Sequence, residues 1–263
     1  VSEKKGTVLM KDRIVVFGSF VADITGTAAH FPAPGETVLG ETFKIGPGGK
    51  GSNQAIAAHR AGGDVTLVTK LGEDPFGRMA KEFYENEGMG TSHLLFDKDA
   101  GSGAALIMVN SSTAQNMILV HLGACNHITY EDVEREKELI AQADLLLVQL
   151  EMNLEALAHI IEIAAENHTR VILNPAPAQE LPDDLLSKID IVTPNETETE
   201  ILTGVTVDSL QTAHAAADVF LQKGVKNVVI TLGSNGVYVT DGKQEEIIPC
   251  IRVNAVDTTG AGD

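Results

Sequence analysis

The feature that most constrains this chain is a repeated alternation of short apolar, β-branched runs with amphipathic helical patterns. Six runs are mostly apolar and do not alternate strictly between apolar and polar residues, which is typical of strands buried on both faces. They are Ile14–Phe17, Val65–Val68, Leu145–Val148, Val171–Leu173, Ile189–Val192 and Val228–Thr231. Strands separated by helices form parallel sheets with crossover helices. The sequence therefore predicts an α/β fold: a doubly wound, mostly parallel sheet with helices on both faces.

Five amphipathic segments suit the crossover helices. They are Ser52–Ala61, Phe76–Glu87, Tyr130–Ala141, Leu154–Asn167 and Asp208–Lys223. Thr129 and Asn153 are good N-caps for two of them, and Gly224 is a natural stop for the last. No linker divides the chain, so we expect one domain over residues 11–263, with residues 1–10 as an extension.

Two segments break the alternation, because no helix lies between their strands. Glu36–Ile45 and Gly103–His121 are interpreted as strands, and the second turns at Asn110-Ser111-Ser112. We expect a small β lid, inserted at about 34–46 and 101–121, that covers a site at one end of the main sheet. The alternative is a hairpin without a function.

The net charge of the chain limits the classes of partner that it can bind. It has 37 acidic against 19 basic residues, for a formal net charge of −18. This disfavours both nucleic-acid backbones and anionic membrane surfaces, and no apolar run approaches the roughly 20 residues of a membrane helix. Cys125 and Cys250 are too few for a disulfide scaffold. We expect a cytoplasmic protein with no nucleic-acid or membrane partner.

A glycine-rich segment, Gly46 to Asn53, lies between a predicted strand and a predicted helix. It matches G-x-G-x-x-G by its letters, but it follows the lid instead of the first strand of the sheet, which weakens a dinucleotide interpretation. Glycines let the backbone approach a ligand closely. Lys50 and Asn53 add donors that suit a polyhydroxylated molecule. A tight turn with a solvated lysine is the alternative.

The segment from Asp257 to Asp263 is more specific. Glycine and alanine at the expected start of a helix offer backbone N–H groups to an anion. The carboxylate of Asp263 beside them can take a proton from an attacking hydroxyl. Phosphoryl transfer needs this combination. A plain Asp-Gly turn, the alternative, explains the glycines but not the threonines and the two acids.

A third polar cluster, Thr193 to Glu200, directly follows the strand that ends at Val192. Sheets of this class bind ligands at the carboxyl ends of their strands, and oxygen-rich side chains there suit hydrated Mg²⁺. The alternative is a helix N-cap at Asn195, with acids favoured in the first turn. The histidines show no zinc-ligand spacing.

Taken together, these clusters resemble the ribokinase-like (PfkB-type) carbohydrate kinases, most closely the ribokinase branch. The likeness runs from Arg13 to Asp263. Its motifs are Gly18-Ser19…Ala22-Asp23, Pro34-Gly35-Glu36-Thr37, Gly48-Gly49-Lys50-Gly51-Ser52-Asn53-Gln54-Ala55, Gln149-Leu150-Glu151, Asn174-Pro175-Ala176-Pro177-Ala178, Thr193-Pro194-Asn195-Glu196, Thr231-Leu232-Gly233-Ser234 and Asp257 to Asp263.

The resemblance implies transfer of the γ-phosphate of ATP to a pentose hydroxyl, in that branch from D-ribose to ribose 5-phosphate. It implies ATP, Mg²⁺ and an activating K⁺, and a homodimer formed through the β lid. Two alternatives stay open. One is a kinase for 2-deoxyribose or for another sugar or nucleoside. The other is a non-catalytic sugar- or nucleotide-binding sensor.

The resemblance also implies roles by matching position. The sugar would be held by Asp23, Gly49, Lys50, Asn53 and Glu151. Asp263 would be the base, and the anion hole would consist of Gly260, Ala261 and Gly262. The nucleotide would contact Asn195, Thr231, Gly233, Ser234 and Gly236. Metal ions would be held by Glu198 (Mg²⁺, through water) and by Asp257 and Thr259 (K⁺).

The chain departs from the family pattern at two places. Val21 replaces an asparagine of the ribokinase pattern, and valine forms no hydrogen bond. An unpaired sugar hydroxyl costs about 1–3 kcal/mol, so we expect a weaker preference for ribose, towards 2-deoxyribose or another pentose. The sequence also stops at Asp263, and we expect it to omit a C-terminal part that in the family completes the adenine pocket.

Overall fold

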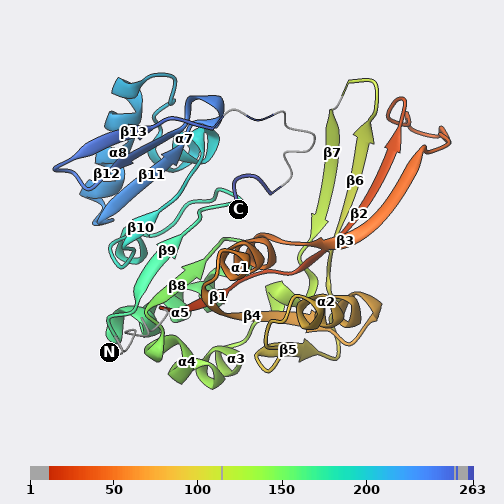
Figure 1. The fold of residues 1–263 in the computed structure, drawn as a ribbon, viewed down its shortest axis with the longest axis horizontal. Helices are drawn as coiled ribbons and strands as arrows, with labels where there is room; N and C mark the ends of the chain where they lie inside the picture. The colour runs from red at the N-terminus through yellow and green to blue at the C-terminus, as the bar shows by residue number, and fades with distance from the viewer. Residues whose placement is uncertain (1–11, 114, 252, 254–259) are drawn as a thin grey trace, which may run out of the picture.

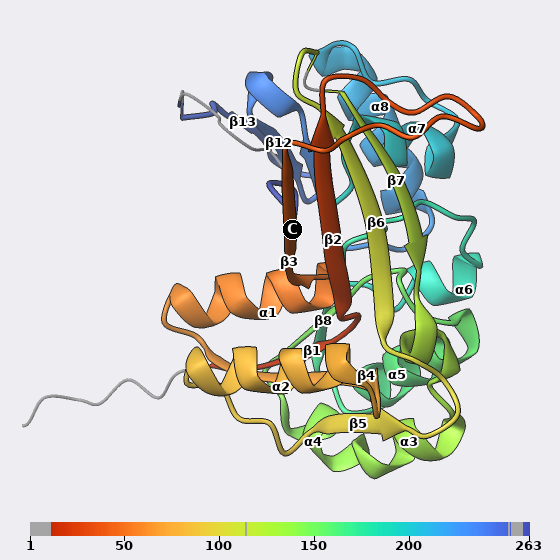
Figure 2. The same ribbon diagram turned by 90° about the vertical axis from the view of Figure 1, so that its right-hand side faces the viewer.

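The structure is a computed structural model that describes residues 12–113, 115–251, 253 and 260–263 (Figure 1). It contains a nine-stranded main sheet and a separate four-stranded small sheet. Helices cover the main sheet, whereas the small sheet stands away from the core (Figure 2). The predicted α/β class is confirmed.

The main sheet has the strand order β13-β12-β11-β10-β9-β8-β1-β4-β5. Its strands are β1 Arg13–Phe17, β4 Asp64–Gly72, β5 Leu94–Asp97, β8 Leu145–Val148, β9 Arg170–Leu173, β10 Ile191–Val192, β11 Asn227–Thr231, β12 Val237–Thr240 and β13 Glu245–Ile248. The strands from β11 to β5 pair in parallel, and β12 and β13 are antiparallel. All six predicted strands are present. The sequence did not predict β5, β12 and β13, which have only four residues each; β5 and β13 are the edge strands of the sheet, and β12 lies next to β13.

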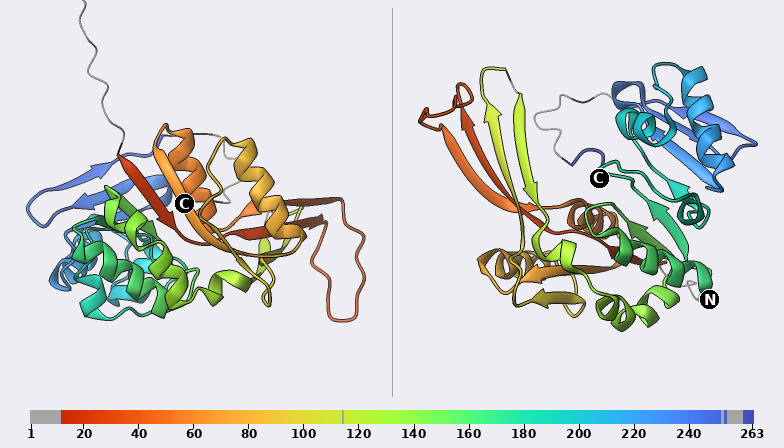
Figure 3. Two further views of the ribbon diagram at one scale, coloured as in Figure 1. Left: turned by 90° about the horizontal axis from the view of Figure 1, so that it is seen from below. Right: turned by 180° about the vertical axis from the view of Figure 1, so that it is seen from behind.

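Helices flank the main sheet on both faces, with α1 and α2 on one side (Figure 3). They are α1 Lys50–Arg60, α2 Pro75–Asn86, α3 Tyr130–Arg135, α4 Lys137–Gln142, α5 Leu154–Glu166, α6 Asp183–Leu186, α7 Glu196–Thr203 and α8 Leu210–Gln222, with the short 3₁₀ helices η1 Gly123–His127 and η2 Gly233–Asn235. Alternate residues of β1 pack into separate cores on the two faces of the sheet. Val15 and Phe17 pack in the core formed with α3–α8, whereas Val16 packs in the core formed with α1 and α2. This explains the mostly apolar strands.

The helix ends agree with the sequence at three places and differ at one. Thr129 and Asn153 cap α3 and α5 as expected, and Gly224 follows α8 with a φ of 95°. The single helix predicted over 130–141 is instead two short helices. They meet at Glu136, whose φ of −98° and ψ of 4° interrupt the helical geometry.

The small sheet has the order β3-β2-β6-β7. Its strands are β2 Val21–Ala28, β3 Thr42–Gly48, β6 Gly103–Asn110 and β7 Asn116–His121. Two expectations need correction here. Residues 36–41 form no strand, and β2 was not predicted, because polar and small residues such as Asp23 and Gly26 interrupt its apolar pattern. β2 becomes a strand by pairing with β3 and, in parallel, with β6.

Among the described residues, no helix combines the length and apolar character that crossing a bilayer requires.

Candidate active site

Asp263 lies against the first turn of α1. Its carboxylate accepts a hydrogen bond from Asn53 Nδ2 at 2.8 Å and pairs with Lys50 Nζ at 3.4 Å. Its side chain is only 9% exposed. Lys50 and Asp263 are 213 residues apart in the sequence. Their contact brings the glycine-rich segment and the C-terminal segment into one site, as the sequence predicted.

The glycines before α1 are required by close packing against β2. A Cβ on Gly48 would lie 2.2 Å from the Asp23 carboxylate, and a Cβ on Gly49 would lie 2.7 Å from the Val21 nitrogen. Gly49 also has a φ of 91°, which L side chains rarely adopt. The loop is therefore a tight strand-to-helix turn that brings Lys50 and Asn53 to the site, and it follows β3 of the small sheet.

A cavity of about 390 Å³ lies between the small sheet and α1. All five residues assigned to the sugar line it, together with Asp263; they are Asp23, Gly49, Lys50, Asn53 and Glu151. Its opposite wall comes from β6 and β7 and is mostly apolar, through Ala105, Ile107, Ile118 and Val120, with Asn116 as its one polar residue. We call it the sugar-side cavity.

Three carboxylates, those of Asp23, Glu151 and Asp263, line the sugar-side cavity, and their repulsion contributes to a raised pKa of Asp23. Burial raises the pKa of Asp23 to about 6, with further contributions from the charges of Glu151 and Asp263. Glu151 is held in place, because its Oε2 accepts hydrogen bonds from the Lys50 backbone N–H at 2.8 Å and from the Ser19 hydroxyl. Ser19 was not predicted; it occurs in a family motif, but nothing in the sequence links it to Glu151.

A second cavity of about 190 Å³ lies at the carboxyl ends of β9, β10 and β11. Its walls include Asn195, Glu198, Thr231 and the predicted anion hole of Gly260, Ala261 and Gly262. We call it the phosphate-side cavity. Lys50, Gly260 and Asp263 line both cavities. The predicted base therefore lies where the two cavities meet.

Asn195 and Glu198 form a reciprocal cap at the start of α7. Asn195 Oδ1 accepts from the Glu198 N–H at 2.8 Å, and Glu198 Oε2 accepts from the Asn195 N–H at 2.9 Å. The capping interpretation is thus confirmed, but Glu198 also lines the phosphate-side cavity. Burial raises the pKa of Glu198, and the nearby charge of Asp263 adds to this, although Asn195 and Lys50 oppose the shift.

The nucleotide assignments are met only in part. Thr231 lines the phosphate-side cavity, but Gly233, Ser234 and Gly236 do not. Gly236 has a packing reason, since a Cβ there would lie 2.1 Å from the Ile248 carbonyl oxygen. Asp257 and Thr259, the predicted K⁺ site, lie outside the described residues.

The phosphate-side cavity also contains Asn174 and Ala176, to which the sequence assigned no individual role, and Thr193, the first residue of the predicted polar cluster. Asn174 Nδ2 donates to the Thr193 carbonyl at 3.2 Å, whereas Asn174 Oδ1 is buried without a partner among the described residues. These residues directly follow predicted strands, so their position after β9 and β10 was the available signal.

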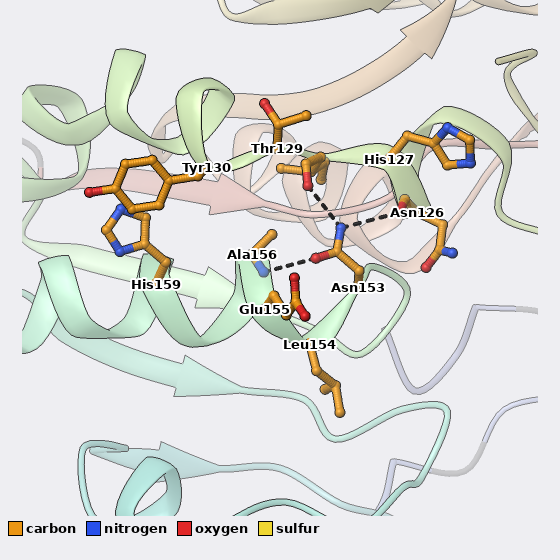
Figure 4. A pocket seen from close by; sticks show the side chains of 10 residues that line it. Asn126, His127, Thr129, Tyr130, Asn153, Leu154, Glu155, Ala156 and His159 are labelled. Atoms are coloured by element: carbon orange, nitrogen blue, oxygen red, sulfur yellow. Dashed lines mark hydrogen bonds between the residues drawn. The ribbon is translucent and has the colours of Figure 1, made fainter. Parts of the chain in front are cut away.

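The largest cavity, about 880 Å³, lies elsewhere, between η1, α3 and the start of α5 (Figure 4). Tyr130 and His159 stack at one end of it, with ring centroids 4.4 Å apart. Asn153 is already occupied, because it caps α5 and donates to the carbonyls of Asn126 and Ile128. This cavity shares no lining residue with the two cavities around Asp263.

Comparisons with known proteins agree with this geometry. Residues 11–263 match the pfkB family of carbohydrate kinases. A ribokinase of Haemophilus influenzae is 44% identical over 254 residues, which cover 97% of this chain and 83% of that protein. A deoxyribokinase of Salmonella typhi is 40% identical over 251 residues, covering 95% and 82%.

Solved structures show the same fold. The structure of Arabidopsis thaliana ribokinase complexed with ribose and ATP superposes with a TM-score of 0.87 at 29% identity, covering 96% of this chain and 83% of that one. Ribokinase from Thermotoga maritima superposes with a TM-score of 0.84 at 32% identity, covering 96% and 82%. The predicted resemblance is confirmed: this chain belongs to the pfkB family of ATP-dependent carbohydrate kinases.

Proposed function

We propose that this protein transfers the γ-phosphate of ATP to a hydroxyl of a pentose, with ribose as the first candidate. The position of Asp263 carries the proposal, because its carboxylate lies where a sugar-side and a phosphate-side cavity meet. Relatives named ribokinase, at 40–44% identity, support ribose as the acceptor.

In this role Asp263 is the general base. Asn53 and Lys50 hold its carboxylate, which takes the proton of the sugar hydroxyl as the oxygen attacks the γ-phosphorus. The N–H groups of Gly260–Gly262 and the ammonium of Lys50 stabilise the charge on the transferring phosphoryl group. Asp23 and Glu151 accept hydrogen bonds from the sugar and orient it.

Glu198 and Asn195 fit a hydrated Mg²⁺. The carboxylate of Glu198 is buried near a second negative charge, which a cation would offset, and Asn195 provides only further oxygen and amide groups. Mg²⁺ favours such oxygen ligands and keeps most of its waters. When bound, the ion supplies positive charge to the phosphate oxygens. The K⁺ site at Asp257 and Thr259 stays a prediction.

The identity of the sugar depends on Val21, which lines the sugar-side cavity and is 2% exposed. A hydroxyl that faces this side chain finds no partner, so we propose that 2-deoxyribose is accepted nearly as well as ribose. The similarity to a deoxyribokinase supports this alternative. Val21→Asn should raise kcat/KM for ribose relative to 2-deoxyribose by about tenfold. A strong ribose preference of the unaltered protein would refute the proposal.

The test of the function is ADP production by the full-length protein with ATP, Mg²⁺ and K⁺, using a panel of ribose, 2-deoxyribose and other sugars. Turnover that depends on a pentose supports the kinase. A protein that binds sugar or nucleotide by calorimetry, yet produces no ADP with any sugar, is a sensor instead.

The outer face of the small sheet suits a second copy of the chain. Two rows of paired residues cross this face from β3 through β2 and β6 to β7. The first row is Phe43, Gly26, Met108 and Met117. The second row is Ile45, Ile24, Leu106 and Leu119. Phe43 is 68% and Leu119 67% exposed, and apolar patches of this kind usually form interfaces. We therefore propose a homodimer formed through this lid. Leu119→Lys should give monomers in sedimentation velocity, whereas Ser112→Lys at the hairpin turn should not.

We also propose a cytoplasmic location, because both Cys125 and Cys250 are free thiols, as a reducing compartment keeps them.

A further inference from the structure

We propose that Lys70, Asp74 and Ser102 are positioning residues for the acceptor sugar, a role that rests on the proposed function. They hold both ends of the β6–β7 hairpin, which forms the mostly apolar wall of the sugar-side cavity. None of them lines that cavity or the phosphate-side cavity.

Besides these attachments, the hairpin is held by β2, which pairs with β6 over its full length from Gly103 to Asn110. In the described part of the chain the helices lie against the main sheet, and the small sheet rises from the core beside α1 (Figure 2). β6 pairs with β2 and β7, whereas β7 pairs within the sheet only with β6. The polar wall of the cavity comes from β2, α1, Glu151 and Asp263. The β2–β6 pairing fixes the register of the hairpin, and the attachments at its two ends hold its base against the main sheet.

The first end is Ser102, directly before β6. Its backbone N–H donates to Asp74 Oδ2 at 2.7 Å, and its hydroxyl donates to Asp74 Oδ1 at 2.8 Å. The same hydroxyl accepts from the Gly72 N–H at 2.9 Å. Asp74 is itself fixed, since it caps α2 through the Gly77 N–H at 2.8 Å. Ser102 is 6% exposed, so these bonds do not compete with bulk water.

The second end is η1, which follows β7. Lys70 Nζ donates to the His127 carbonyl at 2.7 Å and to Asp132 Oδ2 at 2.7 Å, and it pairs with Asp97 Oδ2 at 3.3 Å. Lys70 is 6% exposed. Its carbonyl also accepts from the Cys125 thiol at 3.2 Å.

The two ends also contact each other, because the Ala124 N–H donates to the Gly101 carbonyl at 2.8 Å. Gly123 permits this approach, since a Cβ there would lie 2.3 Å from the same carbonyl oxygen. Lys70 and Gly72 belong to β4, and Asp74 follows it immediately. One strand end of the main sheet thus holds both ends of the hairpin.

A sugar binds tightly only while the hairpin is in place. If looser attachment reduces the fraction of molecules with a correctly placed hairpin, the apparent sugar affinity falls by the same factor. The apparent affinity for the nucleotide should not change, because no residue of β6 or β7 lines the phosphate-side cavity. A split between the two KM values separates positioning from general destabilisation.

The experiment compares Ser102→Ala and Lys70→Met with Thr169→Val in the full-length protein. Thr169 is the matched control: its buried hydroxyl donates to the Ile140 carbonyl at 2.9 Å, far along the sequence from the hairpin. We expect the sugar KM to rise about tenfold in Ser102→Ala, within the range for the loss of the two buried hydrogen bonds of the Ser102 hydroxyl. The KM for ATP should change less than about twofold, and Thr169→Val should alter neither KM value.

Hydrogen–deuterium exchange provides the second measurement. Amides of residues 103–121 should exchange faster in Ser102→Ala than in the unaltered protein or in Thr169→Val. If the exchange and the sugar KM stay at control values, the proposal is wrong. If the unaltered protein phosphorylates no sugar, the proposed function is wrong, and a role of these residues in binding a sugar substrate is wrong with it. The exchange measurement still shows whether these residues hold the hairpin in place. Should Lys70→Met fail to fold, Ser102→Ala decides.

Discussion

The two sheets of this protein bury their side chains in opposite ways. In the main sheet, neighbouring residues of β1, such as Val15 and Val16, enter separate cores on the two faces. In the small sheet, Phe43 and Leu119 are about two-thirds exposed. The main sheet is therefore stabilised by burial, whereas the small sheet depends on its strand pairing and on its attachments to β4. A region with so little core of its own can move and can specialise in ligand contacts.

The same division runs through the site. The sugar-side cavity is lined by β2, β6 and β7 of the small sheet together with α1, Glu151 and Asp263, whereas no residue of β6 or β7 lines the phosphate-side cavity. Substitutions in the small sheet should therefore alter the KM for the sugar. Substitutions of residues that line both cavities should alter kcat. Five further predictions test this division.

Asp263→Asn should have the largest effect, because the residue serves both cavities. We expect kcat to fall by about 10²–10⁴, the usual contribution of a general base. The dissociation constant for the sugar should change only a few-fold, as measured by calorimetry. Turnover close to that of the unaltered protein would remove Asp263 from the chemistry.

Lys50→Ala should raise the sugar KM by about 10–100-fold, because a hydrogen bond to a charged group contributes about 1.5–3 kcal/mol. Since Lys50 also lines the phosphate-side cavity, kcat should fall as well. Initial rates at varied sugar concentration measure both. Lys81→Ala is the control, because Lys81 forms only a surface pair with Glu85. Equal effects of the two substitutions would contradict the assignment.

Asp23→Asn should stabilise the sugar-free protein. The pKa of Asp23 is raised to about 6 by burial, and then by Glu151 and Asp263, so ionisation of Asp23 opposes folding. This penalty is complete above pH 6 and disappears as the pH falls towards 3.8. We expect about 1–2 kcal/mol of added stability at pH 8, after allowance for partial solvent access. Urea unfolding at pH 8 and pH 4 measures it, and a pH-independent gain would contradict this cause.

The sugar KM of the unaltered protein should rise as the pH falls through about 6, because protonated Asp23 loses acceptor capacity.

His214→Gln should have the smallest effect, since His214 lies on α8, where its exposed side chain contacts Glu245 of the edge strand β13. A hydrogen bond to Glu245 raises the pKa of His214, and the charge of Asp218 adds to this. The stabilisation is therefore complete below pH 6.5 and is lost as the pH rises through the raised pKa. We expect the Tm of the variant to be slightly lower than that of the unaltered protein at pH 6 and equal to it at pH 9. The kcat and KM values should not change. A kinetic defect would show that the division between the regions is incomplete.

Much of the main sheet could be predicted because burial on both faces leaves a local mark. Val65–Val68 and Val228–Thr231 each consist of aliphatic residues and one threonine, and each lies within an observed strand. β2 left no such mark. Its residues Val21 and Asp23 line the sugar-side cavity, and its parallel partner β6 begins more than 70 residues later. Pairing between distant segments cannot be recognised from a short window of sequence.

The sequence by itself determined the chemistry of the site: a base beside glycines, donors after a tight turn, and acids after a strand. These are local patterns, since residue type and spacing over a few positions suffice to encode them. Only the tertiary structure decided that Asp263 contacts Lys50 and Asn53, that Gly236 serves packing, and that β4 holds the hairpin. Distances between remote residues, and the burial that raises the pKa of Asp23, arise only when the whole chain packs.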